Sequence, residues 1–476
     1  MGRIAQAVGA GLVAAALAAG AAAAQDVATK QYADGSVYEG QFLNGRPHGT
    51  GTYRLPDGYE YTGEWVDGEI RGQGRARYAN GAIYEGAFVA GKPEGRGKMT
   101  FSDGRTYEGD WSGGQRTGLG TETYPGGATY TGAMLNGLPQ GKGVFEDPSG
   151  YRYDGDWDSG RKTGQAVITY PNGARYEGAV VDGAHQGQGA LVMPDGLTYV
   201  GAWEDGQMQG AGKLTQPNGD VYEGAFAGGQ RSGTGKVAYA DGSRYEGAFA
   251  ADRRHGQGRF ESPDGLVYEG TWIEGRIEGQ GRKTYPDGSV YEGGFVAGVP
   301  QGRGRMVWPD GSAYEGDWTE GRIEGKGRSQ APDGSVYEGD FRDGQRHGTG
   351  TLTHPDGYRY EGPWVEGRRE GVGLAVYPDG SRYEGPFVAD LREGDGVLTR
   401  PDGYRYEGRF TAGAATGTGV ARWPSGDSYE GSFLDGRPHG TGIARYAGGQ
   451  SAGGTWTNGL LTAPAPAEAT PPPAGE

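Results

Sequence analysis

The chain has 476 residues, of which 101 are Gly, 31 are Tyr and none is Cys, and its formal net charge is −16. The lack of Cys excludes disulfides, thiolate chemistry and Cys-based zinc sites, and an acidic chain does not attract nucleic acid through its overall field. Abundant Gly together with abundant aromatic residues is typical of many short strands joined by tight turns, because disordered chains contain few aromatics.

The N-terminal segment has the features of a secretory signal. Arg3 precedes an apolar stretch rich in Ala and Gly, and Ala22 to Ala24 supply small residues before a cleavage site at Gln25. We predict that residues 1–24 are a signal peptide and that the protein is exported, either to the periplasm of a bacterial-type cell or to the extracellular space. An uncleaved membrane anchor is the alternative, although a stretch made mostly of Ala is only weakly apolar.

A 23-residue repeat fills most of the remaining chain. Residues 25–37 hold a leader and a half-repeat, and residues 38–459 hold the repeat array, in which eighteen Tyr follow one another without an insertion. A degenerate nineteenth repeat begins at Ala452. The eighteen Tyr, which we number position 0 of each repeat, are Tyr38, Tyr61, Tyr84, Tyr107, Tyr130, Tyr153, Tyr176, Tyr199, Tyr222, Tyr245, Tyr268, Tyr291, Tyr314, Tyr337, Tyr360, Tyr383, Tyr406 and Tyr429.

The positions within a repeat predict two strands and two turns. Position +2 is always Gly, +4 is Phe or Trp in all repeats but two, +11 and +20 are always Gly, and +13 is Gly except at Ala166. Alternation with a period of two places 0, +2 and +4 on one face of a first strand and +13, +15 and +17 on one face of a second. We expect +4 to lie opposite +13, so that +2 faces +15 and each large side chain lies beside a small one.

Turn residues mark both connections. A Pro-Asp-Gly sequence at +18 to +20, as at Pro56 to Gly58, suits a tight turn, because Pro presets φ, Asp bonds its own backbone and Gly accepts a positive φ. The second connection carries Gly at +7 and +11. The expected fold is an all-β, elongated, twisted antiparallel meander of about 18 hairpin repeats that advances about 10 Å per repeat, or about 170 Å in all. Residues 460–476 are rich in Ala and Pro, and we expect a disordered tail there.

The repeat resembles a known family. The pattern Tyr-Glu-Gly-x-Phe/Trp-x-x-Gly-x-x-x-Gly-x-Gly, as it begins at Tyr38 to Gly45, is similar to the MORN (membrane occupation and recognition nexus) repeat over Tyr38 to about Gly459. Thr62, Thr131 and Val200 depart from it at +1, and Asp252 and Asp390 depart from it at +7. The resemblance implies a twisted sheet that acts in contacts with proteins, in dimerisation or at membranes. It also implies that any enzyme activity would need an appended domain, and we find none.

Two columns of residues are candidates for binding. Position +14 is basic in six consecutive repeats, which predicts a stripe about 50 Å long that could hold anionic lipid headgroups or an acidic polymer: Lys213, Lys236, Arg259, Arg282, Arg305 and Arg328. The simpler interpretation is that these cations neutralise the Glu column at +1. The rings at +4 form either the core or a groove for an apolar helix of a partner: Phe42, Trp65, Phe88, Trp111, Trp157, Trp203, Phe226, Phe249, Trp272, Phe295, Trp318, Phe341 and Trp364.

No constellation in the sequence is typical of catalysis, of cofactor binding or of a metal site. His48, His255, His347 and His439 all lie at +10, where other repeats carry Arg, Glu, Thr or Gln, so we expect a solvated turn; His185 and His354 are isolated. The sequence therefore predicts a non-enzymatic scaffold without cofactors, which binds other proteins or itself in the cell envelope or outside the cell. Peripheral binding to anionic lipid or to an envelope polymer through the basic stripe is the alternative, and nucleic acid is not an expected partner.

Overall fold

The computed structural model describes residues 27–465, and these residues form strands and turns without a helix. They divide between an N-terminal unit, which ends at Gln207, and a C-terminal unit, which begins at Met208. The predicted signal peptide, residues 1–24, lies outside the described residues, as does the end of the predicted tail. An all-β meander is thus confirmed in each unit.

Each repeat contributes a seven-residue strand from −1 to +5, and all but two contribute an unbroken nine-residue strand from +8 to +16. The N-terminal unit contains β1 (Val27–Gln31), β2 (Val37–Leu43), β3 (Arg46–Arg54), β4 (Glu60–Val66), β5 (Glu69–Arg77), β6 (Ile83–Val89), β7 (Lys92–Thr100), β8 (Thr106–Ser112), β9 (Gln115–Thr123), β10 (Thr129–Leu135), β11 (Leu138–Glu146), β12 (Arg152–Asp158), β13 (Arg161–Thr169), β14 (Arg175–Val181), β15 (Ala184–Val192) and β16 (Thr198–Glu204).

The C-terminal unit continues the same alternation. It contains β17 (Gln207–Thr215, whose first residue belongs to the N-terminal unit), β18 (Val221–Ala227), β19 (Gln230–Ala238), β20 (Arg244–Ala250), β21 (Arg253–Glu261), β22 (Val267–Ile273), β23 (Arg276–Thr284), β24 (Val290–Val296), β25 (Val299–Val307), β26 (Ala313–Thr319), β27 (Arg322–Gln330), β28 (Val336–Arg342), β29 (Gln345–Thr353), β30 (Arg359–Val365), β31 (Arg368–Arg369), β32 (Gly371–Val376), β33 (Arg382–Val388), β34 (Leu391–Arg392), β35 (Gly394–Thr399), β36 (Arg405–Thr411), β37 (Ala414–Arg422), β38 (Ser428–Leu434), β39 (Arg437–Arg445), β40 (Ser451–Thr457) and β41 (Leu460–Pro464).

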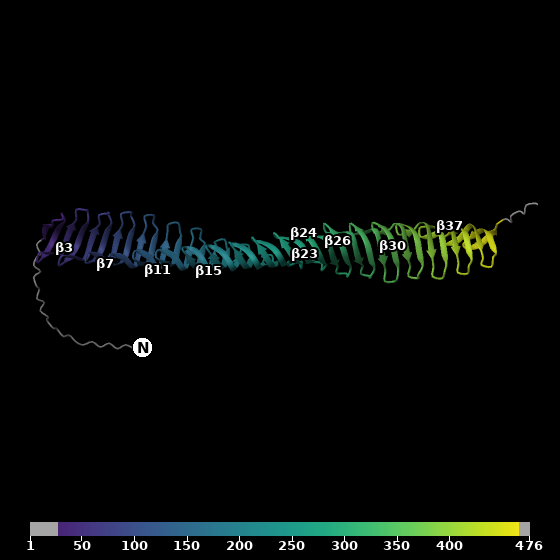
Figure 1. Ribbon diagram of the computed structural model, residues 1–476, viewed down its shortest axis with the longest axis horizontal. Coiled ribbons are helices and arrows are strands. Elements are labelled where there is room, and N and C mark those ends of the chain that lie inside the picture. The colour runs from purple at the N-terminus through teal and green to yellow at the C-terminus, as the bar shows by residue number, and fades with distance from the viewer. Residues whose placement is uncertain (1–26, 466–476) are drawn as a thin grey trace, which may run out of the picture. The chain divides into compact units, whose positions relative to one another are not determined.

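Within each unit, strands that follow one another in sequence pair antiparallel, as β2 does with β1 and β3, and as β20 does with β19 and β21. Figure 1 shows that the strands of each unit turn progressively along that unit, as strand twist requires. The second strand of a repeat is split in two places, at β31/β32 and at β34/β35. Both splits lie opposite a Pro at +3, Pro363 and Pro386, which has no N–H to give to the ladder.

Both turns match their sequence signals. In the first repeat, the N–H of Gly58 donates to the carbonyl of Leu55, and the carboxylate of Asp57 accepts the N–H of Tyr59. Asn44 and Gly45 join β2 to β3 with φ of 53° and 76°, the two positive values of a type I′ hairpin. The predicted turn residues at +7 and at +18 to +20 therefore act as expected, but the predicted turn glycine at +11 does not: Gly49 lies inside β3, at the bulge, with a φ of 74°.

The expected strand register is wrong. In the first repeat, Tyr38 lies opposite Tyr53 at +15 and Gly40 lies opposite Gly51 at +13, and after a bulge Phe42 lies opposite Pro47 at +9. The glycine that faces a +4 ring comes from the preceding repeat, as Gly49 faces Trp65. At this bulge, three residues of the second strand, +10 to +12, lie opposite the single residue +3. The pairing therefore shifts by two residues, which a strict period of two cannot reveal.

The tyrosine at position 0 is the centre of the core. Tyr38 is fully buried, and its ring covers Gly51 and reaches Gly40, where any added Cβ would collide with it. Its hydroxyl donates to the carbonyl of Gln41 at 3.0 Å, so the bulge residue at +3 satisfies the buried oxygen. The ring meets Phe42 and Trp65 edge to face, with both centroid distances at 5.0 Å. Gly in the strand interior therefore makes room for the ring of its own repeat.

Strands also occupy parts of the predicted leader and tail. β1 supplies the half-repeat, and it begins at Val27. β41 covers residues 460–464 and pairs with β40, as Trp456 lies opposite Leu461. The expectation of disorder from residue 460 onward is wrong for these residues, because Leu461 covers Gly454 and an edge strand accepts Pro464.

Candidate interaction surface

The rings predicted to line a groove lie in the core. Phe42 is partly exposed, but the other twelve are buried, with exposed fractions from 1% at Phe88 to 7% at Trp157. The tryptophans among them contact the preceding repeat, where the Trp65 ring meets Tyr38 edge to face and its indole N–H donates to the carbonyl of Gly51 at 3.3 Å. We call the side of the sheet that carries the rings at 0 and +4 the aromatic face. The +4 rings form its buried layer, and side chains at other positions cover them.

Position +9 forms the outer layer of this face. It lies opposite +4 across the bulge, and it carries either an apolar residue such as Pro47 or Ile70, or a cation. Seven cations at this position lie over the rings at 0 or +4: Arg116, Lys162, Arg231, Arg254, Arg346, Arg369 and Arg392. The closest is Arg254, whose guanidinium carbon lies 4.0 Å from the Trp272 centroid.

The partly buried +9 cations find two kinds of hydrogen-bond partner. Burial lowers the pKa of Lys162 and of Arg254, because it penalises the charged form. The ammonium of Lys162 donates to the Tyr151 hydroxyl at 3.0 Å. Several guanidinium groups bind the next type I′ turn instead, as Arg116 Nη2 does at the carbonyl of Gly137 at 2.7 Å. The +9 cation thus joins adjacent repeats.

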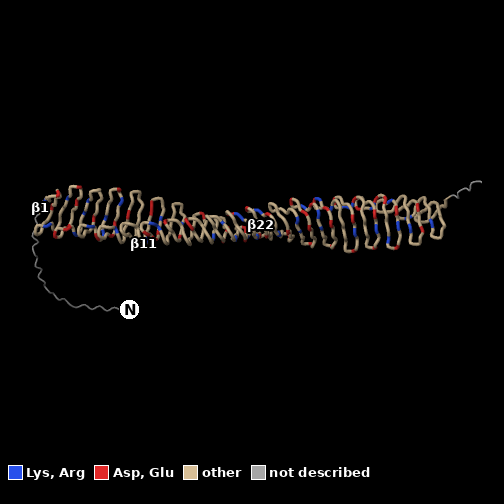
Figure 2. Tube along the Cα trace, in the orientation of Figure 1, with Lys and Arg blue, Asp and Glu red and all other residues tan. Residues whose placement is uncertain are grey.

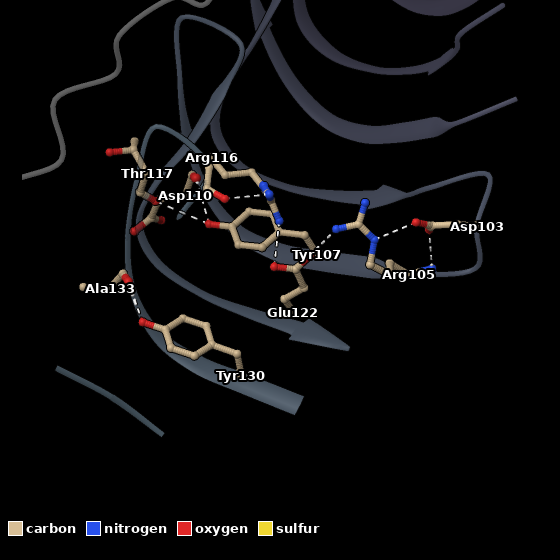
Figure 3. A network of polar contacts seen from close by, with 10 residues as sticks. Asp103, Arg105, Tyr107, Asp110, Arg116, Thr117, Glu122, Tyr130 and Ala133 are labelled. Atoms are coloured by element: carbon tan, nitrogen blue, oxygen red, sulfur yellow. Dashed lines mark hydrogen bonds and ion pairs between the residues drawn. The ribbon is translucent and has the colours of Figure 1, made fainter. Parts of the chain in front are cut away.

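One buried ion cluster stands out on the aromatic face of the N-terminal unit (Figure 3). Glu122 occupies +15, where most repeats carry an apolar residue, and is 2% exposed. Its carboxylate lies 2.8 Å from Arg116 Nη1 and 3.1 Å from Arg105 Nη1, and Arg105 also pairs with Asp103 at 2.7 Å. A cavity of about 320 Å³ adjoins the cluster. Because both cations neutralise the carboxylate, we interpret the cluster as structural: Glu122 and its partners occupy the place that an apolar +15 side chain fills in most repeats.

The same face is open at the start of the N-terminal unit. A hollow of about 440 Å³ is lined by Tyr32, Pro47, Tyr53, Trp65 and Ile70, together with turn residues. Tyr53 meets Trp65 at 5.9 Å and Tyr32 at 6.3 Å between centroids. We call this the N-terminal hollow. Apolar lining with a few polar groups at the rim is the usual character of a binding site.

The opposite face carries the charged columns. Each +14 residue lies opposite the +1 residue of its own and of the following repeat, as Lys236 does with Glu223 and Glu246. Figure 2 shows the resulting mixture of both signs along each unit. In the predicted basic stripe, Lys213 pairs with Glu223 at 2.7 Å, Lys236 with Glu246 at 2.9 Å, and Arg328 with Glu338 at 3.0 Å.

The other stripe residues also have acidic neighbours. Arg259 contacts Glu261, while Arg282 and Arg305 both lie opposite Glu292. A hollow of about 360 Å³ beside the stripe has acids as well as cations in its lining, Glu246 and Glu261 with Lys236 and Arg259. The stripe is therefore a chain of alternating charges.

Among the histidines at +10, His48 caps a turn. His48 Nδ1 accepts the N–H of Asp67 at 3.4 Å, and in other repeats a Glu or Gln at +10 accepts the equivalent N–H, as Glu94 does from Gly113 at 2.8 Å. His185 lies at +9, stacks on Tyr176 at 3.6 Å and bonds to the Tyr170 hydroxyl at 2.7 Å, and burial lowers its pKa. No group of three or more potential ligands that could hold a metal occurs within residues 27–465.

Sequence reasoning missed the +9 column and Glu122. The signal for +9 was weak, because the column mixes Pro, Ile, Ala, Met, His, Lys and Arg, and only the bulge shows that it shares the face of the rings. Glu122 could have been found as the acid in an otherwise largely apolar +15 column. No helix able to cross a membrane is found between residues 27 and 465.

Comparison with known proteins agrees with the repeat geometry. The MORN repeat family matches eighteen consecutive segments, from residues 38–58 to residues 429–451. No curated protein matches the chain. The TCP domain of SAS-4 (dCPAP) of Drosophila melanogaster, solved with a proline-rich motif of Ana2 (dSTIL), shares 15% identity over 48% of this chain and 99% of that one, with a TM-score of 0.21. The wild-type TCP10 domain of Danio rerio CPAP shares 16% identity over 55% of this chain and 95% of that one, with a TM-score of 0.14.

These low TM-scores carry no argument about function, whereas the family match covers most of the chain. The chain therefore belongs to the MORN repeat family, whose repeats form non-catalytic scaffolds.

Proposed function

We propose that this protein is an exported scaffold that binds partner polypeptides on its aromatic face. The observation that carries the proposal is the N-terminal hollow, where Tyr32, Tyr53 and Trp65 surround a space of about 440 Å³. Aromatic anchors in desolvated pockets dominate protein–protein binding energies. An apolar side chain of a partner is the natural occupant, because the lining offers apolar area and few charges.

The charged face offers less to a partner than the aromatic face does. Its cations and carboxylates lie in register across neighbouring strands and pair with each other, as Lys213 does with Glu223. Exposed pairs of this kind contribute little binding energy of their own. A partner would therefore gain more from the aromatic face than from the charged one.

Photo-crosslinking from adjacent positions tests the proposal. Tyr53 faces the N-terminal hollow, while Thr52, the preceding residue in β3, bonds to Thr62 on the other face. We expect p-benzoylphenylalanine at position 53 to capture a defined polypeptide in the native envelope or secreted fraction, and the same photo-amino acid at position 52 to capture none. Capture that occurs equally from both positions, or from position 52 alone, would contradict the assignment of the aromatic face.

Export is supported by the sequence of residues 1–24. Mass spectrometry of the mature N-terminus is expected to find Gln25 as the first residue. A chain that retains Met1 and sediments with membranes would favour the uncleaved anchor instead.

Self-association is a second candidate because both end strands have an open edge. Within the described residues, β1 pairs only with β2 and β41 only with β40, and unpaired edges recruit further strands. Light scattering over a range of protein concentrations would reveal it. A mass that stays at the monomer value would remove this candidate and leave the proposal for partner binding untouched.

A further inference from the structure

The C-terminal unit contains a second hollow on its aromatic face, of about 550 Å³. We call it the C-terminal hollow. Its apolar lining includes Trp423, Pro424, Pro438, Tyr446 and Trp456. Trp423 is 36% exposed and Tyr446 42%, so two large rings present their surfaces to whatever occupies the space. Asp427 is the one charged residue of its lining among the described residues.

The hollow exists because the repeat degenerates here. Position +9 is Pro438, where many earlier repeats carry an Arg that covers the rings. Position +15 is Ala444, and it lies opposite Ala452, which replaces the tyrosine that would begin the next repeat. The small side chains of Pro438, Ala444 and Ala452 therefore leave the Trp423 and Tyr446 rings exposed to solvent.

A segment of this chain follows directly beside the hollow. β40 begins just after the turn at Tyr446 to Gln450, and β41 returns antiparallel toward that turn. The last described residue, Ala465, donates its N–H to the carbonyl of Gly453 at 2.8 Å. Residues 466–476 therefore start at the end of the strands where Tyr446 lies, and they include Pro466 and the run from Pro471 to Pro473.

We propose that residues 466–476 fold back into the C-terminal hollow and place their prolines against Trp423 and Tyr446. Proline-rich segments favour an extended left-handed helix and dock in grooves lined with aromatic rings at a low cost in entropy. Eleven residues in that conformation reach about 34 Å. Trp423, which precedes β38, lies about four strand spacings from β41, or about 19 Å, so the segment is long enough. This inference does not depend on the N-terminal hollow or on any partner.

A single spin label can test this, because the chain has no Cys. Thr470→Cys in the full chain provides a unique site for a nitroxide, and its electron paramagnetic resonance spectrum reports local mobility. We expect a slow component in the otherwise unchanged protein. The double variant Trp423→Ala/Tyr446→Ala should abolish that component, with a several-fold faster motion of the label. Pro471→Gly/Pro472→Gly/Pro473→Gly should do the same without any change to the array.

The matched control is Trp308→Ala, which removes a ring from the same repeat position, +17, elsewhere in the C-terminal unit. It should leave the slow component unchanged. The proposal is overturned if the label moves equally fast in every variant, or if the slow component survives both the ring and the proline substitutions. A slow component that disappears on dilution would assign the hollow to the tail of a second copy, and would also overturn it. Circular dichroism checks that each variant retains its strands.

Discussion

The carboxylate of Asp252 accepts two hydrogen bonds from Arg231, the residue that lies twenty-one positions earlier. The main-chain N–H of Arg231 donates to Asp252 Oδ1 at 2.9 Å, and Nε donates to the same oxygen at 3.2 Å. Arg369 and Asp390 repeat the arrangement, with both distances at 3.0 Å. Asp252 and Asp390 are the two residues that replace Gly at +7, so each departure from the repeat pattern is matched by an Arg at +9 of the preceding repeat.

The Asp252 contact predicts an order of stability among substitutions at +7. Asp252 has a φ of 65°, which costs a non-Gly residue about 1 kcal/mol. Asp252→Ala keeps this cost and loses the bonds to Arg231, whereas Asp252→Gly loses the bonds and relieves the backbone. We expect Ala to be less stable than Gly by about 1 kcal/mol, measured by hydrogen exchange in β19 to β21, because repeats open locally.

Gly275→Ala is the matched control for this comparison. Gly275 occupies +7 with a φ of 88° and has no side-chain contact to lose. Its substitution should show the backbone cost alone. If Asp252→Ala and Asp252→Gly exchange at the same rate, the left-handed conformation is not what selects the residue at +7.

The two core glycines of a repeat should differ in their tolerance. A Cβ at Gly247, position +2, would lie 2.5 Å from the Cα of Gly258 and 2.7 Å from the carbonyl oxygen of Gln257, which are backbone atoms. A Cβ at Gly258, position +13, would meet the Tyr245 ring, which can shift. We expect Gly247→Ala to cost about 3 kcal/mol and Gly258→Ala about 1 kcal/mol, measured by urea unfolding of single variants.

The natural sequence supports this order. Position +2 is Gly in every repeat, but +13 is occupied by Ala166 in one, and there Tyr153 stays fully buried with its hydroxyl 2.6 Å from the carbonyl of Asp156. Equal destabilisation by the two substitutions would mean that the tyrosine ring is as immobile as the backbone.

Much of the fold could be predicted from the sequence, because the strands and turns of each 23-residue repeat are set by local conformational requirements of the backbone. Positive-φ glycines, the Pro-Asp-Gly turn and the alternation of 0, +2 and +4 each report a local requirement of the chain. The bulge is different, because it places three residues of the second strand opposite one residue of the first, as residues 48–50 lie opposite Gln41. No residue of the repeat pattern marks this shift, so the register and the role of +9 could not be found from alternation alone, whereas the core interpretation of the +4 rings was available from the sequence and is confirmed by their burial.

The Glu122 cluster predicts asymmetric effects of its two main members. Arg116→Ile would leave a buried carboxylate with only Arg105, which is partly exposed, as its partner. We expect this change to cost about 3 kcal/mol. Glu122→Leu should cost about 1 kcal/mol, because Arg346, in a repeat that carries Leu352 at +15, is held over the rings of Tyr337 and Trp364 without such a carboxylate.

The double variant Arg116→Ile/Glu122→Leu should regain most of the loss, since it removes both charges from the core. Urea unfolding of the four proteins forms a double-mutant cycle. Additive effects would show that the two side chains do not interact through their charges.

Alkaline pH should unfold the array through its buried tyrosines. Burial raises the pKa of Tyr84, Tyr107 and Tyr268 to about 12, from an unfolded value near 10. The stability that this shift represents is complete below pH 10 and is lost as the pH rises toward 12, because the unfolded chain releases its phenol protons first. Tyrosinate absorbance and circular dichroism should therefore change together in that window. Smooth tyrosinate formation near pH 10 with the strands intact would show that the rings are accessible to solvent.

The basic stripe leads to a prediction about membranes. Its cations lie opposite a column of glutamates, and Lys213, Lys236 and Arg328 already pair with Glu223, Glu246 and Glu338. A lipid headgroup would have to compete with carboxylates held in register about 5 Å away across the strands, so the stripe has little net field to offer an anionic surface.

We therefore expect flotation with anionic vesicles to be equal for the unchanged protein and for a variant with all six stripe residues replaced by Ala. Replacement of Glu223, Glu246, Glu269, Glu292, Glu315 and Glu338 by Gln should instead create salt-sensitive flotation, because it frees the same cations. If the unchanged protein floats and the Ala variant does not, the stripe binds lipid despite its glutamates, and the alternative function through anionic lipid gains its first support.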